Sequence, residues 1–315
     1  MKVSLEPAIK VQTQKGRLGH YFRQNYMLYL FLLPSLACII IFNYGPMYGI
    51  QIAFKDFKGF KGIWGSDWVG LKHFITFFNT YRFGLLIKNT LAISIYTLVA
   101  GFPAPIVLAL LFNYVKYPRF KKFAQTVSYA PHFISTVVLV GMMQLFFSTS
   151  TGFVNTAIAA LGFEKIFFFG RPEYFRHLYV WSGVWQSMGW NAVIYMASLA
   201  GVDPQQHEAA IIDGAIILQR MWHIDLPAIM PTIVILLIMQ FGSLMGVGYE
   251  KVYLMQNATN LTTSEIISTY TYKIGLEQAQ YSYSAAIGLF NNIVNFILLI
   301  TVNQIARKLS GMALW

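Results

Sequence analysis

The sequence has 315 residues, of which 56% are hydrophobic, 17% are aromatic and only 11% are charged. Soluble proteins carry about 25% charged residues, so this composition indicates an integral membrane protein. The net charge of +11 comes from Lys and Arg residues scattered over several loops, which fits contact with anionic lipid rather than nucleic-acid binding. The single cysteine, Cys38, excludes a disulfide framework and a cysteine-rich metal site.

The chain starts with a basic segment that contains Lys2, Lys10, Lys15, Arg17 and Arg23. The apolar run that follows is too long for the core of a cleaved signal peptide, and it shows no clear small-residue cleavage site. We therefore predict a basic cytoplasmic tail over residues 1–25.

Six uncharged runs follow, each long enough to cross a bilayer, for which a helix needs roughly 20 residues. Continuous apolar runs of this length predict helices, because the strands of membrane barrels alternate apolar and polar residues. We predict an all-α membrane protein with a transmembrane domain over residues 26–305 and a cytoplasmic C-terminal tail over residues 306–315. The six predicted spans cover residues 26–53, 89–115, 123–147, 178–202, 226–248 and 282–305. Pro103 and Pro105 predict a kink in the second span.

The loop after the second span predicts the orientation, because it holds Lys116, Arg119, Lys121 and Lys122. Short basic loops remain in the cytoplasm under the positive-inside rule. This places both termini and residues 203–225 on the cytoplasmic side and the three longer loops outside. We expect a multi-pass protein of the bacterial cytoplasmic membrane.

A polar segment over residues 203–227 separates the fourth and fifth spans. Asp203 can cap the free N–H groups of a helix, and Pro204 suits the first helical turn. Gly214 can adopt the left-handed conformation that ends a helix. A second short helix, about residues 216–223, leads to Pro227, which starts the next span. These signals predict two short helices joined by a bend on the membrane surface.

The same segment resembles the EAA coupling loop of binding-protein-dependent ABC importer permeases. The pattern is Glu-Ala-Ala, three residues, Gly, nine residues and Ile-x-Leu-Pro, which matches Glu208, Ala209, Ala210, Gly214, Ile224, Leu226 and Pro227. The rest of the chain is similar to permeases for oligosaccharides and heteropolysaccharide fragments, including alginate-type importers. Residues 44–49, 60–65, 101–105, 131–135 and 309–315 carry this likeness.

The resemblance implies a type I ABC importer permease fold in which the six helices form half of a pore. A second, homologous and different permease would supply the other half, and an extracytoplasmic solute-binding protein would deliver the oligosaccharide. Two ATP-binding subunits would hold ATP and Mg²⁺, while this chain would hold no cofactor, no metal and no catalytic residue. Glu208 would face a basic residue of an ATPase, with Asp213 close to the same contact. The sequence contains no phosphate loop of its own, which agrees with a partner ATPase.

Polar residues inside the predicted spans are candidates for a sugar path, because such groups are costly in lipid unless they face a cavity or another helix. The alternative is that they form hydrogen bonds between helices and hold the bundle together. The candidates are Gln144, Trp185, Gln186, Asn191, Tyr195, Gln240, Asn291, Asn292 and Asn295.

Two other classes of protein compete with this interpretation. A secondary transporter driven by an ion gradient usually carries carboxylates or basic residues inside its spans, and the predicted spans contain no Asp, Glu, Lys or Arg. A membrane-bound enzyme such as a glycosyltransferase would need an acidic cluster near one face, and the only such cluster is the coupling segment. The predicted outer loops hold more basic than acidic residues, which suits an acidic glycan, although lipid headgroups explain them equally well.

Overall fold

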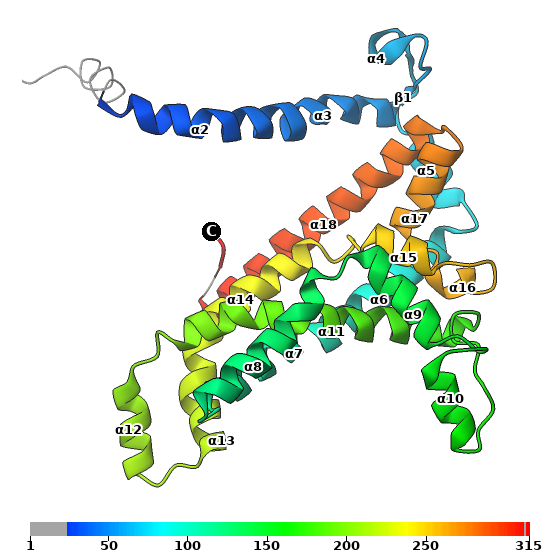
Figure 1. Ribbon diagram of the computed structural model, residues 1–315. Coiled ribbons are helices and arrows are strands. Elements are labelled where there is room, and N and C mark those ends of the chain that lie inside the picture. The colour runs from blue at the N-terminus through cyan, green and yellow to red at the C-terminus, as the bar shows by residue number, and fades with distance from the viewer. Residues whose placement is uncertain (1–23, 312) are drawn as a thin grey trace, which may run out of the picture.

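The computed structural model describes residues 24–311 and 313–315, so the predicted basic tail lies almost wholly outside the described residues. Within this part the chain is almost entirely helical, with one pair of very short strands. Figure 1 shows the helices gathered around the long helix α11 (Pro172–Leu199), while the first span extends away from them. The fold class is therefore all-α, as predicted.

The first span is a single helix over Tyr26–Phe54 that stands apart from the bundle. No residue of its longest part, α2, is buried, and the packing against α18 comes from its last turn. Its parts are α2 (Tyr26–Ile39), a π-helical turn (Ile40–Tyr44), α3 (Gly45–Met47) and a 3-10 turn (Tyr48–Phe54). Nearly all of the apolar surface of this helix is left uncovered by the chain itself.

A small folded loop connects this helix to the second span. It contains an antiparallel pair of two-residue strands, a single helical turn between them and a short helix that packs against α18. These elements are β1 (Lys55–Asp56), α4 (Gly62–Gly65), β2 (Asp67–Trp68) and α5 (Lys72–Asn79).

The second span consists of α6 (Phe83–Gly101) and α7 (Pro103–Asn113), which together form one long membrane helix. The helix is interrupted only at Phe102, which keeps helical backbone angles. Pro103 has no N–H group to donate, so the interruption falls where the prolines predict it.

The third span is not the single helix that the sequence predicts for residues 123–147. It is broken into α8 (Pro118–Tyr129), a 3-10 turn (Ala130–Phe133) and α9 (Thr136–Phe146), and the two halves are bent by 100°. Ser135 has an extended backbone and its hydroxyl caps α9 by accepting from the N–H of Val138 at 3.3 Å. This cap starts a new helix at the break and fixes the change of direction.

Two further helices follow the broken span: α10 (Phe153–Ala160) and the central helix α11. The helix α11 covers the predicted fourth span up to Leu199, three residues before its predicted end, and packs against α6, α7, α8, α14 and α16. In the described part of the chain, four helices are long and apolar enough to cross a membrane, or five if the bent pair counts as one span. The more polar α11 makes a six-span arrangement compatible with the structure.

The segment after α11 contains α12 (Pro204–Ile212) and α13 (Ile217–Arg220). The second short helix is not separate, because α13 passes through a π-helical turn (Met221–Asp225) directly into α14 (Leu226–Gly242). Proline cannot donate to the carbonyl four residues earlier, and the wider π turn accommodates Pro227 without ending the helix. The fifth span also ends earlier than predicted, at Gly242 rather than residue 248.

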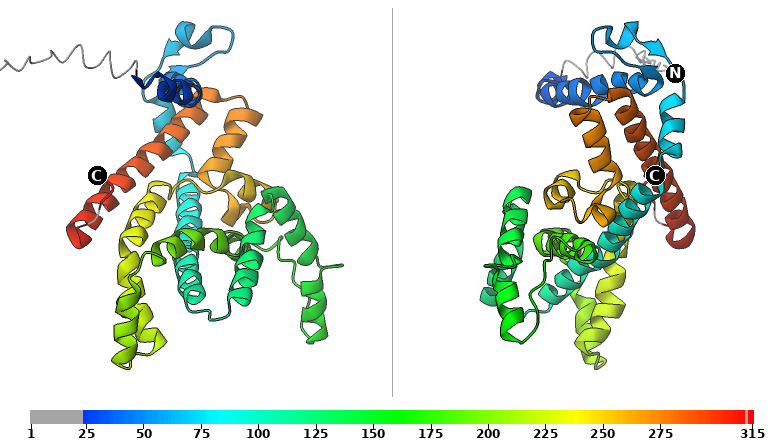
Figure 2. Two further views of the ribbon diagram at one scale, coloured as in Figure 1. Left: turned by 60° about the vertical axis from the view of Figure 1, so that its left-hand side comes forward. Right: turned by 90° about the vertical axis from the view of Figure 1, so that its right-hand side faces the viewer.

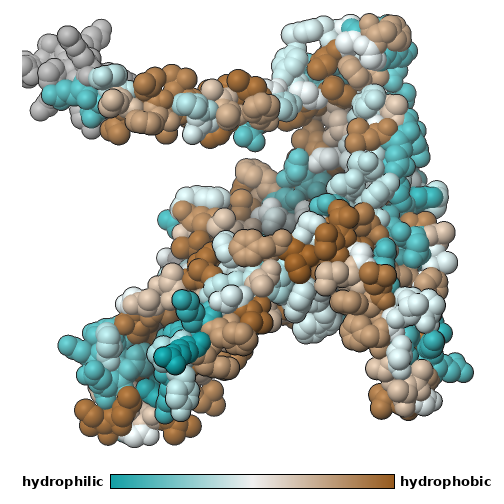
Figure 3. Space-filling view, viewed as in Figure 1, coloured by the Kyte–Doolittle hydropathy of each residue, from teal (hydrophilic) through white to brown (hydrophobic). Residues whose placement is uncertain are grey.

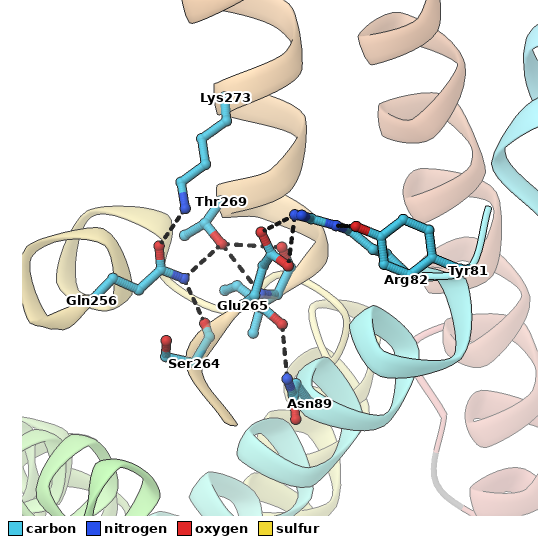
Figure 4. Close-up of polar contacts among 9 residues, drawn as sticks. Tyr81, Arg82, Asn89, Gln256, Ser264, Glu265, Thr269 and Lys273 are labelled. Atoms are coloured by element: carbon cyan, nitrogen blue, oxygen red, sulfur yellow. Dashed lines mark hydrogen bonds and ion pairs between the residues drawn. The ribbon is translucent and has the colours of Figure 1, made fainter. Parts of the chain in front are cut away.

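The chain between the last two spans folds into a compact polar cap instead of an open loop. Its helices are α15 (Tyr249–Met255), α16 (Leu261–Ser264), α17 (Ile267–Tyr272) and a π-helical turn (Lys273–Glu277), and α18 (Tyr281–Ser310) completes the bundle. Figure 4 shows how Arg82 at the start of the second span donates to both carboxylate oxygens of Glu265, at 2.9 and 3.2 Å. Asn89 donates to the backbone carbonyl of Glu265 at 3.0 Å, so the cap is tied firmly to α6.

Candidate coupling segment and transport cavity

The polar helix α12 begins and ends as the sequence predicts. The carboxylate of Asp203 accepts from the backbone N–H of Gln205 at 2.9 Å, which satisfies one free donor of the first turn. Gly214 has a φ of 79°, and the N–H of Ala215 donates back to the carbonyl of Ala210 at 2.8 Å. This arrangement closes the helix in the way typical of a left-handed glycine.

The outer surface of this segment is free of intramolecular partners. Glu208, Ala209, Asp213 and Gly214 are exposed and Ala210 is half-buried, and no ion pair among the described residues uses either carboxylate. Large apolar side chains surround them, at Ile211, Ile212, Ile216, Leu218 and Trp222. Figure 3 shows apolar side chains at this tip of the molecule, beside hydrophilic ones. An exposed apolar patch with a charged margin is typical of a protein interface.

Asp225 anchors the segment, and the sequence analysis did not single it out. This side chain is fully buried and accepts from the Tyr114 hydroxyl at 2.7 Å and from the Asn113 amide at 3.3 Å. His207 of α12 lies 3.2 Å from the same carboxylate, and Arg220 lies over the Tyr114 ring at 5.3 Å. The cluster fastens α12 to the ends of α7 and α14. The sequence signal that could have identified Asp225 is its position between Ile224 and Leu226, the apolar residues of the motif.

The remaining motif residues mark the start of the fifth span. Ile224 lies in the π-helical turn, while Leu226 and Pro227 are the first residues of α14. Ile224 and Leu226 are half-buried, whereas Pro227 is exposed. The contact of Asp225 with Tyr114 also puts the loop after the second span at the same end of the molecule as α12. Figures 1 and 2 show this end opposite the end that carries β1 and α4.

A cavity of 540 Å³ lies between the second span, α11 and α14. Four candidate path residues line it together: Gln186, Asn191 and Tyr195 of α11, and Gln240 of α14. Its size falls within the range of roughly 300–1,000 Å³ that is typical of small-molecule sites. Lys251 of α15 also lines this cavity, and the sequence analysis missed it because it had assigned the residue to an outer loop.

The other candidates lie elsewhere. Trp185 lines a separate apolar cavity of 400 Å³, and Gln144 lines a third of 260 Å³. Asn291 donates to the carbonyl of Met245 at 3.3 Å, and Asn295 accepts from its N–H at 2.8 Å. These two asparagines therefore hold the non-helical chain after α14, which is the structural alternative considered for them. Asn292 is exposed on α18.

In the described ranges no group of three or more His, Cys, Asp or Glu side chains could hold a metal ion. The structure combines apolar membrane helices, a polar cavity between them and an exposed helix fastened to two spans. These features define a helical membrane transport protein.

Residues 101–311 match the family described as "Binding-protein-dependent transport system inner membrane component". The match covers more than half of the chain, and the chain therefore belongs to this family of ABC transporter permeases. Membership decides against the ion-gradient-driven carrier and the membrane-bound enzyme.

Characterised relatives cover nearly the whole chain. The polygalacturonan/rhamnogalacturonan transport system permease protein YteP of Bacillus subtilis (strain 168) is 46% identical over 299 residues, covering 95% of this chain and 93% of that protein. The protein LplB of the same organism is 44% identical, covering 91% and 90%.

Two solved structures are also similar to this chain. A chain of a bacterial ABC transporter for the acidic polysaccharide alginate is 37% identical with a TM-score of 0.86, over 93% of this chain and 99% of that chain. A chain of a bacterial alginate ABC transporter in complex with alginate pentasaccharide-bound periplasmic protein is 36% identical with a TM-score of 0.87, over 95% and 100%.

Proposed function

We propose that this chain is the translocating permease subunit of an ABC importer for oligosaccharides, including fragments of acidic polysaccharides. The observation that carries the proposal is the path from α12 through the Asp225 cluster to α14, whose far half lines the cavity. A movement imposed on α12 reaches the cavity wall along this path. Reorientation of the cavity between the two sides of the membrane is the expected result.

Two ATP-binding subunits are proposed as the source of that movement. The exposed carboxylates of Glu208 and Asp213, together with the exposed side chain of Ile212, offer a charged and apolar surface for docking. ATP and Mg²⁺ would bind on those subunits, and this chain would supply the motif residues from Glu208 to Pro227 as the docking element.

A second, homologous permease is proposed as the partner that covers the first span. The apolar side chains of this helix are exposed along α2 and up to the last turn, which packs against α18, and Figure 3 also shows this for α2. Lipid covers one side of such a helix, and packing against another permease explains why the chain does not fold the helix onto its own bundle. The two permeases would form the complete pore.

The names of the relatives support the substrate class. YteP is named for polygalacturonan and rhamnogalacturonan, and the alginate transporter structure contains a periplasmic protein with a bound pentasaccharide. We infer that an extracytoplasmic solute-binding protein delivers an oligosaccharide to this importer. The chain would lie in the bacterial cytoplasmic membrane with both termini in the cytoplasm, and the transmembrane domain would extend over residues 26–305.

Copurification tests the docking surface. Ile212 is 85% exposed, and we expect Ile212→Asp combined with Glu208→Arg to abolish copurification of the ATPase. Leu161→Asp is the matched control, because Leu161 is 75% exposed at the end of α10, outside the segment. Retention of the ATPase by the double variant would overturn the proposed function.

A further inference from the structure

The ammonium group of Lys251 is buried at the wall of the 540 Å³ cavity. Lys251 is only 9% exposed, and it lies on α15, which follows the fifth span and packs against α11. Its Nζ atom donates to the backbone carbonyl of Tyr179 at 2.9 Å and lies 4.8 Å from the centre of the Tyr179 ring. The tertiary fold thus brings one cation to the transport cavity.

Among the described residues, no carboxylate forms an ion pair with this ammonium. The four ion pairs among the described residues do not include Lys251, and Lys251 is the only charged residue that lines the cavity. By contrast, Arg82 is paired with Glu265 in the cap. A buried cation without a counter-charge is costly, so such a group usually serves a site.

The ammonium retains capacity to bind an anion. It has three N–H donors, and the Tyr179 carbonyl accepts one of them. Space for the group exists because residue 183 is glycine: a Cβ atom there would lie 3.3 Å from Nζ. The α11 helix therefore leaves room beside Lys251 on the side that faces the cavity.

The rest of the lining fits a carbohydrate. Gln186, Asn191 and Gln240 supply amides, Ser187 and Ser243 supply hydroxyls, and all of them line the same cavity as Lys251. Amides and hydroxyls exchange hydrogen bonds with sugar hydroxyl groups, whereas an ammonium forms its strongest hydrogen bonds with a carboxylate. One cation among neutral polar groups matches a sugar that carries one carboxylate per unit.

We propose that Lys251 binds the carboxylate of an acidic sugar unit during transport, so that the cavity favours uronate oligosaccharides over neutral ones. This inference rests on the proposed function, because it assumes that an oligosaccharide passes through this cavity. In the empty cavity the ammonium bonds to the Tyr179 carbonyl, and it exchanges or adds a partner when a uronate arrives. Because the ammonium has to rearrange only its one hydrogen bond to Tyr179, binding of the uronate stays reversible, and transport requires reversible binding.

The test uses the whole importer in proteoliposomes, with its ATPase subunits, second permease and solute-binding protein. The probes are trigalacturonate and its neutral trimethyl ester, each supplied at a concentration that saturates the binding protein. We expect Lys251→Met to lower trigalacturonate uptake at least tenfold while uptake of the ester changes less than twofold. Lys251→Arg keeps the charge and should restore most of the trigalacturonate uptake.

Equal loss of both probes in Lys251→Met would indicate a structural role and overturn the proposal, as would uptake of trigalacturonate at the wild-type rate. Gly183→Ala provides a second variant that keeps Lys251 but crowds its ammonium, and it should lower trigalacturonate uptake about two- to fivefold with the ester unaffected. If the wild-type importer takes up neither probe nor any other oligosaccharide, the proposed function itself fails, which is a different result from a loss confined to the variants.

Discussion

His207 of α12 and Asp225 at the foot of α14 lie 3.2 Å apart, and the Asp225 carboxylate is fully buried. The contact joins α12 to the span that lines the 540 Å³ cavity. Tyr114 and Asn113 bind the same carboxylate from the end of the second span. One side chain thus holds α12 and the start of α14 to the end of the second span, which is more than 100 residues earlier in the sequence.

Removal of this carboxylate should weaken both the fold and the coupling. Asp225→Ala would leave the Tyr114 and Asn113 donors without their acceptor, and we expect a loss of about 2–4 kcal/mol of stability. The loss of stability would appear as a lower thermal unfolding midpoint of the purified complex, and the loss of coupling would appear as less uptake per ATP hydrolysed. Glu164→Ala is the control, since Glu164 is an exposed acid after α10 and outside the coupling segment, and its unfolding midpoint should stay unchanged. An unchanged midpoint for Asp225→Ala would contradict this role.

Gly214 tests whether the left-handed bend matters for coupling. A Cβ atom at this position would meet nothing within 4 Å, so a substitution acts through the φ of 79° alone. Gly214→Val should cost about 1–2 kcal/mol locally and lower uptake per ATP hydrolysed, whereas Gly214→Asn should be milder because asparagine tolerates this conformation. Gly59→Val, at a loop glycine with equal space and no positive φ, should have little effect. Equal ratios of uptake to hydrolysis in all variants would disprove the need for the bend.

Gln186 should stabilise the broken third span. Its amide donates to the carbonyl of Ile134 at 2.8 Å, next to the 100° bend. Gln186→Leu leaves that carbonyl without its partner, and we expect a loss of about 1–3 kcal/mol, seen as a lower unfolding midpoint. Asn191→Leu, in the same cavity but exposed, is the matched control and should unfold at the wild-type temperature. Identical midpoints for the two variants would show that the bond is dispensable.

Uptake of an acidic sugar should fall at alkaline pH. Burial lowers the pKa of Lys251 to about 8, so its positive charge is present below this pH and is lost above it. The carboxylates of the sugar stay ionised throughout, because carboxyl groups titrate near pH 4. Initial uptake of trigalacturonate, normalised to ATP hydrolysis, should therefore drop several-fold between pH 7 and pH 9. Lys251→Arg should give a flat profile, since arginine remains charged above pH 12.

We assign this pH dependence to Lys251 and not to the titratable groups on the helices that pack against it. Tyr179 of α11 faces the ammonium directly, and α9 carries no titratable side chain. On α17, Tyr270 belongs to a core cluster with Tyr283, and the ring of Tyr272 makes a tilted contact with Tyr249 and an edge-on contact with Tyr253 on the helix of Lys251. A profile that falls equally in wild type and in Lys251→Arg would assign the effect to another group.

Local signals predicted much of this structure. Long apolar runs located the spans, and Asp203, Pro204 and Gly214 set the ends of α12, because caps and left-handed glycines act within a few residues. The 100° bend was missed, although Pro131 and Ser135 were visible, because hydropathy does not distinguish a straight apolar run from a broken one.

The missed site residues depend on tertiary contacts. Lys251 follows the fifth span and looks like an ordinary outer-loop charge, and its burial arises only because α15 folds back on α11. Asp225 lies inside the coupling motif, but its hydrogen-bond donors Tyr114 and Asn113 come from the end of the second span, which the sequence does not show to be near it. Asn291 and Asn295 had the polarity of path residues, and the structure places their amides against the backbone of Met245 after α14.

The unbroken run of helix from Ile217 to Gly242 has a mechanical consequence. At a rise of about 1.5 Å per residue its 26 residues span about 39 Å, so a tilt of roughly 10° at the lower end swings the upper end by about 7 Å. The helix runs without a break through the π-helical turn at Met221–Asp225 and past Pro231, so the two ends move together as long as these two sites do not bend. A small rotation on the nucleotide side would thus be magnified into a displacement as wide as a sugar ring.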